Sequence, residues 1–311
     1  MISRILLFFS VSIVSLLITF PVVWVLEFLH LTQHIRQEGP ATHRSKAGTP
    51  TMGAIGLIIT IIAFAFIFID FDLNLKYFAL ILLTLGFGLI GLTDDLIKVY
   101  KRRNEGLTFW QKIILQSVLA AAFSMFIMLG HHPQLKLFTF IHPIFYFLFS
   151  TFIIVGTANA TNLTDGLNGL LAGTASIAFL AFGLLAIKSG HPYAATFCII
   201  ASGAIFAFLF FNFPRARVFM GDVGSLSIGA ALAGIAIIIQ KELWLMLIGG
   251  IFMIEALSVI LQVISFKLFK KRVFKMTPLH HHFELMGKQE VWIVVGFWIL
   301  AVVLGVTGVL I

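Results

Sequence analysis

Apolar runs long enough to cross a bilayer recur along the whole chain, and they limit its possible folds more than any other feature. The first run extends from Ile5 to Leu26, about the ~20 residues that a membrane-spanning helix needs. Hydrophobic residues make up 60% of the 311 residues and charged residues 11%, whereas soluble domains carry roughly 45–50% and about 25%. So little polar surface cannot cover a water-soluble globule, and the chain is expected to fold within a membrane.

We predict an all-α integral membrane protein, because the runs lack the period-two alternation of an outer-membrane barrel. The first run lacks a small-x-small cleavage pattern, so it is predicted to be a retained helix and not a signal peptide. No linker or low-complexity tract divides the chain, and residues 1–311 are predicted to form a single polytopic membrane domain. About ten transmembrane helices are expected, near residues 5–29, 53–69, 76–93, 111–130, 137–157, 169–187, 193–212, 223–240, 243–266 and 291–310.

The distribution of Lys and Arg predicts the orientation of these helices. Sixteen of the 21 basic residues lie on one side of the predicted membrane, and five lie on the other. Because cytoplasmic loops carry an excess of Lys and Arg, the richer side is predicted to be cytoplasmic and both termini external. The larger loops lie on that same side, so the active site is expected on the cytoplasmic face. These loops are 30–52, 94–110, 158–168, 213–222 and 267–290.

The net charge of +8 does not point to nucleic acid, because no basic stripe interleaved with aromatic residues lies on a polar domain. We therefore expect no nucleic acid among the partners. The single cysteine, Cys198, excludes an internal disulfide and a cysteine-based zinc site.

Four of the six aspartates are predicted to lie where a helix meets the cytoplasm. Ionisable groups at membrane depth are costly, so they indicate functional sites. Asp94 and Asp95 repel each other unless a cation lies between them, and their hard oxygen atoms suit Mg²⁺, which binds one or two carboxylates together with substrate phosphates. The alternative is a solvated helix end that pairs with Lys98 or Arg102.

Polar side chains recur at every third position where the fifth span meets the cytoplasm, as Asn159, Asn162, Asp165 and Asn168. Residues three apart are neighbours on a helix, so the row is predicted to wrap partway round one. Amides and a carboxylate beside an apolar span suit hydrogen bonds to a base, a ribose or a phosphate. Polar contacts between membrane helices are the alternative.

Asp222 follows Gly221 and precedes Gly224 near the predicted start of a helix. Glycines let a phosphate or a metal ion approach the backbone closely. The free N–H groups and the dipole of a helix N-terminus favour anions. A simple N-cap aspartate is the alternative.

Three consecutive histidines, His280, His281 and His282, occur in the last large loop. Consecutive residues cannot easily converge on one tetrahedral zinc ion, so imidazoles that donate to a diphosphate fit better. Neighbouring basic residues suit the same phosphates, or anchor the loop to anionic lipid. A second basic loop carries Lys46, a compact cation suited to a phosphate, although a plain turn with cytoplasmic charges is the alternative.

Taken in order along the chain, these motifs resemble those of the phospho-N-acetylmuramoyl-pentapeptide transferase family. This family lies within the superfamily of polyprenyl-phosphate N-acetylhexosamine-1-phosphate transferases. The superfamily shares the aspartate pair, the Asn/Asp-rich stretch and the glycine-flanked aspartate. The histidine tract 278–284 and the segment 46–53 are specific to the muramoyl branch, and the resemblance covers nearly the whole chain.

The resemblance implies an Mg²⁺-dependent enzyme of peptidoglycan synthesis in the bacterial plasma membrane. It would transfer phospho-MurNAc-pentapeptide from UDP-MurNAc-pentapeptide to undecaprenyl phosphate, giving lipid I and UMP. Its partners would be these two substrates and the lipid bilayer, and the family is usually homodimeric.

The resemblance also implies the site residues. Asp94, Asp95, Asp222 and His280 are the implied catalytic residues. Asp222 is the implied Mg²⁺ ligand, with Asp94 and Asp95 as further candidates, and Asp94 is also the implied base that deprotonates the lipid phosphate. Phe219 would stack on uracil, and an amide stands at Asn168 where many relatives carry Asp. The implied substrate-binding residues are Lys46, Thr51, Asn162, Asp165, Asn168, Asn212, Phe219, Gly221, Ser225, His281 and His282.

Two other functions fit parts of the pattern. A sister enzyme that transfers GlcNAc-1-phosphate from UDP-GlcNAc to a polyprenyl phosphate would share the metal site and differ in the histidine loop. A transporter would place charges near the bilayer midplane on broken helices. The candidate site lies at one membrane surface instead, and Glu255, the one acidic residue deep in a span, is predicted to pack inside the bundle.

Overall fold

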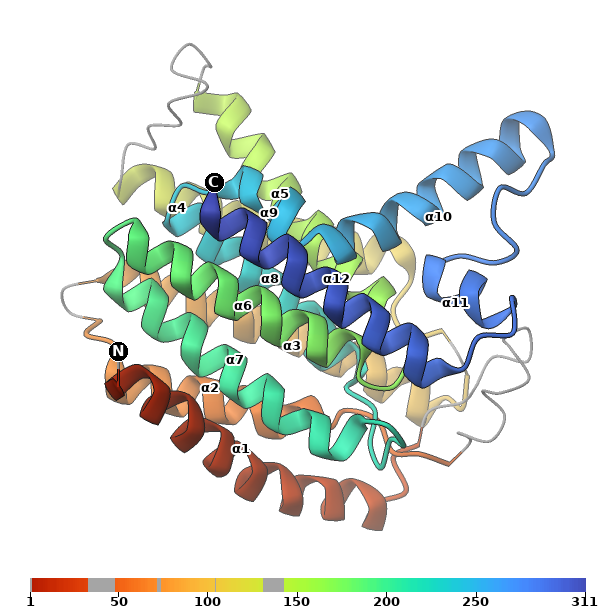
Figure 1. Ribbon diagram of the computed structural model, residues 1–311, viewed down its shortest axis with the longest axis horizontal. Helices are drawn as coiled ribbons and strands as arrows, with labels where there is room; N and C mark the ends of the chain where they lie inside the picture. The colour runs from red at the N-terminus through yellow and green to blue at the C-terminus, as the bar shows by residue number, and fades with distance from the viewer. Residues whose placement is uncertain (1, 33–47, 72–73, 104, 131–142) are drawn as a thin grey trace.

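The computed structural model describes residues 2–32, 48–71, 74–103, 105–130 and 143–311 (Figure 1). Within these ranges the secondary structure is helical, and the one β-type pairing is an isolated bridge between Thr32 and Pro50. Nine described helices are long and apolar enough to cross a membrane, and a tenth, α2, is an apolar helix of 15 residues. The prediction of an all-α integral membrane protein is therefore confirmed.

Ten helices correspond to the ten predicted spans. They are α1 (Ile2–Phe28), α2 (Ala54–Phe68), α3 (Leu75–Tyr100), α4 (Phe109–Gly130), α5 (Pro143–Thr164), α6 (Leu170–Lys188), α7 (Pro192–Asn212), α8 (Gly221–Ile238), α10 (Gly250–Phe269) and α12 (Glu290–Leu310). Three short elements lie between the later spans: η3 (Glu242–Trp244), α9 (Leu245–Ile248) and α11 (Leu279–Glu284).

Helix α8 forms the centre of the bundle, because 94% of its apolar stretch of 18 residues is buried by other parts of the protein. It packs mainly on α3 and α5, while α6 and α7 pack on each other beside it. Its sequence is rich in Gly, Ala and Ser, and small residues allow membrane helices to approach closely without a driving force from water. The tightest packing of the molecule therefore surrounds the helix that begins at Gly221.

Four features of the helices differ from the prediction. Helix α3 was predicted to end near 93 but continues to Tyr100. The span predicted at 243–266 is divided at Gly249, so that η3 and α9 precede α10. Helix α5 was predicted to end near 157 but continues to Thr164, because its polar last turn packs on other helices instead of meeting solvent. Loop 267–290 contains a short helix that was not predicted, α11, which begins directly after Pro278.

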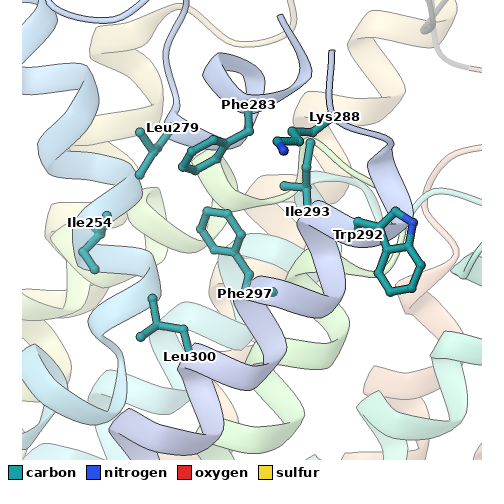
Figure 2. Close-up of a pocket in the computed structure, with 9 residues that line it drawn as sticks. Ile254, Leu279, Phe283, Lys288, Trp292, Ile293, Phe297 and Leu300 are labelled. Carbon is teal, nitrogen blue, oxygen red and sulfur yellow. The ribbon is translucent and has the colours of Figure 1, made fainter. Parts of the chain in front are cut away.

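Helix α10 diverges from the other helices, with α11 beside its far end (Figure 1). Between α10, α11 and α12 lies an apolar groove of about 560 Å³, in which Phe283 and Phe297 face each other with ring centroids 6.2 Å apart (Figure 2). The side chain of Trp292 is 68% exposed at its edge. The groove is lined by Ile254, Leu279, Phe283, Lys288, Trp292, Ile293, Gly296, Phe297 and Leu300.

The two chain ends lie together at one end of the bundle, and α11 lies at the opposite end (Figure 1). The C-termini of α3 and α5 and the N-terminus of α8 share the end that carries α11. All four predicted membrane-surface aspartates therefore belong to one end of the molecule, which is the end predicted to be cytoplasmic.

This orientation can be tested by cysteine labelling in intact cells. In a Cys198→Ala background, Lys271→Cys is expected to react with a membrane-impermeant maleimide only after permeabilisation, because Lys271 is exposed at the end rich in basic residues. Ile311→Cys, which is 78% exposed at the opposite end, should react without permeabilisation. Ready labelling at position 271 in intact cells would reverse the predicted orientation.

Candidate active site

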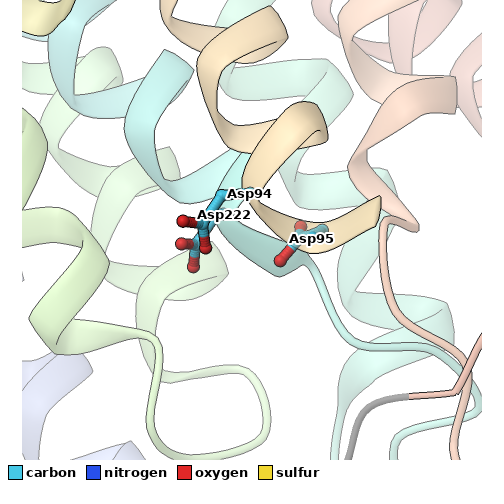
Figure 3. Close-up of side chains that lie close together, drawn as sticks. All are labelled: Asp94, Asp95 and Asp222. Carbon is cyan, nitrogen blue, oxygen red and sulfur yellow. The ribbon is translucent and has the colours of Figure 1, made fainter. Parts of the chain in front are cut away.

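Three carboxylates converge where α3 ends and α8 begins (Figure 3). Asp94, Asp95 and Asp222 each offer an oxygen atom, and these atoms all lie within 4.8 Å of one another. Within the part of the chain that the structure describes, this is the one group of three or more His, Cys, Asp or Glu side chains close enough to hold a metal ion. The sequence had predicted the three residues separately, and the fold brings them together.

Close contact between the two helix backbones creates this convergence. A Cβ atom on Gly91 would lie 2.2 Å from the carbonyl oxygen of Asp222 and 2.5 Å from the nitrogen of Val223. Because these are backbone atoms, they cannot rotate away as a side chain could. Glycine at position 91 therefore allows α3 to touch the first turn of α8.

The turn before Asp222 also requires glycine. Gly221 has a φ of +78°, a conformation that side-chain-bearing residues rarely adopt. A Cβ atom there would lie 2.5 Å from Asp95 Oδ2 and 3.0 Å from Thr51 Oγ1. Gly221 thus lets the loop enter α8 while Asp95 and Thr51 stay beside it.

Two lysines compensate the negative charge of the cluster. Lys98 Nζ lies 2.6 Å from Asp94 Oδ2 and 3.0 Å from Asp222 Oδ2, and it also reaches Asp95 Oδ1 at 3.5 Å. Lys112 Nζ, from α4, lies 2.7 Å from Asp222 Oδ2 and 3.2 Å from Asp94 Oδ1. Asp94 and Asp95 are 1% and 2% exposed, so this part of the helix is not solvated as the alternative supposed, although the pairing with Lys98 that it included is observed. Buried carboxylates of this kind need such partners, because unpaired buried charge is strongly destabilising.

Sequence reasoning noticed Lys98 only as a possible partner and missed Lys112 altogether. The i,i+3 and i,i+4 spacing of Lys98 from the aspartates indicates contact on a helix. Lys112 lies on another helix, and its sequence signal is a basic residue near the predicted start of a span.

Backbone groups hold two of the carboxylates in place. The N–H of Leu107 donates to Asp94 Oδ1 at 2.8 Å, and the N–H of Val223 donates to Asp95 Oδ2 at 3.3 Å. Each carboxylate is therefore oriented by a neutral donor as well as by a lysine.

Asn162, in the last turn of α5, orients the third carboxylate. Its Nδ2 atom donates to Asp222 Oδ1 and to Ser225 Oγ, both at 2.8 Å. Asn159 instead donates to Gln116 on α4, so the predicted polar row does not share one function. Asn159 makes the contact between helices that was the alternative, whereas Asn162 joins the cluster.

The remaining members of the row lie beyond α5. Asp165 follows the helix directly and is partly exposed, while Asn168 is buried in the turn before α6. Asn168 Nδ2 donates to the carbonyl of Pro214 at 3.2 Å. This hydrogen bond joins the turn before α6 to the loop that follows α7.

Asn212 is also occupied by the backbone. Its Oδ1 atom accepts from the N–H of Gly169 at 2.7 Å, and its Nδ2 atom donates to the carbonyl of Val218 at 3.0 Å. The side chain is 4% exposed. Asn212 therefore shapes the loop that leads to Phe219.

The segment around Phe219 pairs with the segment around Thr51. The N–H of Phe219 donates to the carbonyl of Pro50 at 2.8 Å, and the carbonyl of Phe219 accepts from the N–H of Gly53 at 2.9 Å. Thr51 is 1% exposed, and its hydroxyl has no hydrogen-bond partner among the described residues. Thr51 and Phe219 thus border the same loop as Gly221, whereas Lys46 lies outside the described residues.

The three histidines do not converge on one point. His280 contacts Glu255 at 3.2 Å, His281 contacts Glu284 at 2.7 Å, and His282 Nδ1 accepts from the N–H of Lys275 at 3.1 Å. Different partners for three successive side chains agree with the expectation that they would not share a zinc ion.

The donor set of the cluster suits a hard divalent cation. Its side chains present carboxylate oxygens, which Mg²⁺ prefers to nitrogen or sulfur ligands. Asp222 retains 15% exposure of its side chain, so one edge of the cluster faces the open end of the bundle. Asp94, Asp95 and Asp222 could therefore hold Mg²⁺ beside a phosphate-bearing ligand.

We expect Gly91→Ala to destabilise the protein by roughly 1–3 kcal/mol, the usual cost of overpacking, and to weaken divalent-cation binding because it separates α3 from α8. Gly88→Ala is the matched control. It faces the same helix one turn earlier, but its nearest neighbours are 3.6–3.7 Å away, so the added methyl group fits. Thermal melting in detergent and Mn²⁺ binding followed by electron paramagnetic resonance measure both effects. Equal melting temperatures and equal Mn²⁺ affinities of the two variants would argue against the close contact at Gly91.

Known proteins resemble this chain over most of its length. A family model described as glycosyl transferase family 4 matches residues 77–240, a range that includes all three cluster aspartates. The phospho-N-acetylmuramoyl-pentapeptide-transferase of Bacillus mycoides is 45% identical over 310 residues, which cover 96% of this chain and 93% of that protein. The protein of the same name from Bacillus cytotoxicus is 46% identical over 307 residues, with the same coverage.

A third relative of this name, from Bacillus thuringiensis, is 45% identical over 310 residues, again 96% of this chain and 93% of that protein. Identity at this level over nearly the full length of both chains exceeds what a shared fold alone would require. The chain therefore belongs to glycosyl transferase family 4 and, within it, to the family of phospho-N-acetylmuramoyl-pentapeptide transferases.

Proposed function

We propose that this chain transfers phospho-MurNAc-pentapeptide from UDP-MurNAc-pentapeptide to undecaprenyl phosphate, which gives lipid I and UMP. The observation that supports this most strongly is the buried cluster of three carboxylates and two lysines at one end of a membrane bundle. The relatives named for this activity align with almost the whole chain. The reaction takes place at the cytoplasmic face of the bacterial plasma membrane, where the soluble nucleotide donor and the lipid acceptor can meet.

Both substrates carry phosphates, so the chain must neutralise charge and align the reacting groups. Asp222 would hold Mg²⁺, with Asp94 and Asp95 as further ligands, and the ion would supply positive charge that neutralises the donor diphosphate. Lys98 and Lys112 add two positive charges within 3.5 Å of these carboxylates. Asn162 keeps Asp222 in position through its 2.8 Å hydrogen bond.

Asp94 acts as the base that removes the proton of the lipid phosphate, and Asp95 supports it from the next position. A general base must lie within hydrogen-bond reach of the proton that it removes. The 2.8 Å bond from the N–H of Leu107 to Asp94 Oδ1 leaves Oδ2 to interact with Lys98. Approach of an acceptor to Asp94 therefore requires Lys98 to shift toward another carboxylate.

The nucleoside site lies along the loop that precedes α8. Phe219 stacks on the uracil ring, and Thr51, Gly221 and Asp165 border the donor. Asn168 and Asn212 act on this site by holding its backbone, as their bonds to Pro214 and Val218 indicate. The remaining donor contacts are assigned to Ser225, Lys46, His281 and His282, whereas His280, which is 0% exposed, supports the site from behind the turn that carries Asp165.

The apolar groove between α10, α11 and α12 suits the acceptor's polyprenyl chain. Its lining is hydrophobic except for Lys288, and Leu300 and Trp292 are exposed at its edge. A lipid chain can therefore enter from the bilayer while its phosphate stays at the end of the bundle that holds the carboxylates.

The resemblance to a dimeric family further leads us to propose a homodimer.

The alternative donor is UDP-GlcNAc, which would use the same metal site. The histidine tract 278–284 favours the muramoyl donor, because it resembles the motif of the muramoyl branch and the relatives that align with the chain are named for that donor's reaction. A transporter is less well supported, because the helix break at Gly249 lies at the opposite end of the bundle from the aspartate cluster.

Release of UMP by the purified protein tests the proposed reaction. With undecaprenyl phosphate and Mg²⁺, UDP-MurNAc-pentapeptide should support turnover, whereas UDP-GlcNAc should support little. Chelation of divalent cations should abolish release. Faster turnover with UDP-GlcNAc would assign the chain to the sister activity.

The variant Asp222→Asn tests in the same assay whether Asp222 is a ligand of Mg²⁺. Replacing the carboxylate with an isosteric amide removes a charge that Mg²⁺ binding needs, so activity should fall to background with an intact fold. Near-normal turnover with unchanged Mg²⁺ dependence would contradict the role of Asp222 as ligand.

We expect Phe219→Ala to weaken donor binding by roughly 1–3 kcal/mol, the usual value of base–aromatic stacking, with little change in melting temperature. Phe213→Ala is the matched control. Phe213 lies in the same loop but packs on Trp298 with ring centroids 4.8 Å apart, so its loss should lower stability more than donor affinity. Calorimetric titration with the uridine donor and melting curves in the same detergent measure both. Unchanged affinity of Phe219→Ala with a large melting shift would remove Phe219 from the site.

A further inference from the structure

A buried pair of ionisable side chains lies where α11 packs between α10 and the turn that follows α5. Glu255 from α10 and His280 from α11 are both 0% exposed, and Glu255 Oε2 lies 3.2 Å from His280 Nδ1. The backbone N–H of His280 also donates to this oxygen, at 3.4 Å. A carboxylate inside a membrane helix is costly, so its contact with both the ring and the backbone of one residue indicates a specific role.

The other face of the His280 ring packs on a backbone turn. A Cβ atom on Gly166 would lie 2.2 Å from His280 Nε2 and 2.9 Å from Cε1. Neither ring nitrogen has a well-formed hydrogen bond to another described residue. The position of the ring therefore depends on Glu255 on one side and on the absence of a side chain at Gly166 on the other.

This turn is continuous with the candidate active site. Gly166 follows Asp165, whose N–H donates to the carbonyl of Asn162 at 3.3 Å. Asn162 in turn donates to Asp222 at 2.8 Å. Contacts thus run from α10 through α11 to the helix end that orients the cluster.

We propose that Glu255 is a positioning residue, which holds the imidazole of His280 against Gly166 and thereby fixes the turn that carries Asp165. The inference rests on the proposed function, because it takes Asp165 as part of the donor site. Glu255 does not touch substrate and acts only through His280. The neighbouring residues Ile254 and Leu279 line the apolar groove, so the same two helices serve the lipid groove and the donor site.

Glu255→Gln tests the proposal, with Glu242→Gln as its matched control. Glu242 is also buried, at 1% exposure, and accepts a 2.6 Å hydrogen bond from Tyr146, but it follows α8 at the opposite end of the bundle. Calorimetric titration of the detergent-solubilised protein with UMP and Mg²⁺ should show roughly three- to 30-fold weaker binding for Glu255→Gln, the range typical of coupled contacts. Glu242→Gln should bind UMP as the unsubstituted protein does, even if both variants melt at lower temperature. Unchanged UMP affinity of Glu255→Gln would overturn the proposal.

Gly166→Ala provides a second, independent test of the proposal, because its methyl group would displace the imidazole ring of His280. In a double-variant cycle, Glu255→Gln and Gly166→Ala together should weaken UMP binding by less than the product of the single effects, since both act through His280. Multiplicative effects would contradict the shared path.

Histidine resonances provide a readout that does not depend on the reaction. In protein labelled with ¹⁵N-histidine, the signal lost in His280→Gln identifies His280. That signal should move in Glu255→Gln and in Gly166→Ala, and it should stay in place in Glu242→Gln. An unmoved signal would overturn the inference, whereas failure of the unsubstituted protein to bind UMP would contradict the proposed function instead.

Discussion

Contact between the backbones of α3 and α8 determines the geometry of the candidate site. At Gly91 no side chain separates the two helices, so the end of α3 touches the first turn of α8. Three carboxylates are consequently held within 4.8 Å, an arrangement whose repulsion would open the bundle if it were uncompensated. Lys98 and Lys112 supply the compensation, and the neutral donors of Leu107, Val223 and Asn162 orient the oxygen atoms. The site is therefore a set of buried charges whose geometry depends on backbone packing.

The rest of the bundle divides according to how tightly it packs around α8. Helices α3 and α5 pack closely on the small side chains of α8, and α6 and α7 pack on each other, which gives a firm base for the carboxylates. Helix α10 diverges from this base and leaves an apolar groove of about 560 Å³ against α11 and α12. Helix α10 packs on α5, and Glu255 of α10 contacts His280 of α11, whose ring lies against Gly166 in the turn after α5. An apolar groove and a closely packed cluster of charges thus lie in neighbouring parts of the same bundle.

Several features of the fold and the site were predictable from local patterns. Runs of about 20 apolar residues are sufficient to predict membrane helices, since only such helices or closed barrels satisfy their backbone in lipid. Asp94, Asp95, Asp222 and Asn162 were found because polar groups at membrane depth are rare. The division of the span at Gly249 was missed, because an apolar run carries no signal for the packing that ends one helix and starts another. Asn168 and Asn212 carry the same side-chain chemistry as Asn162, yet their bonds go to backbone.

The sequence by itself determined the membrane class and the family, and it located ten apolar helices, of which nine described ones are long enough to cross a membrane. The positions of basic residues predicted the orientation. These properties depend on the amino-acid composition and on the order of residues along short segments of the chain, and folding changes neither. Only the tertiary structure decided which polar residues share a site. Lys112 lies 2.7 Å from Asp222 although 110 positions separate them, and His280 lies against Gly166 although they belong to distant segments. Such contacts arise from helix packing, in which each approach distance depends on side chains of several helices at once, so no local pattern in one segment encodes them.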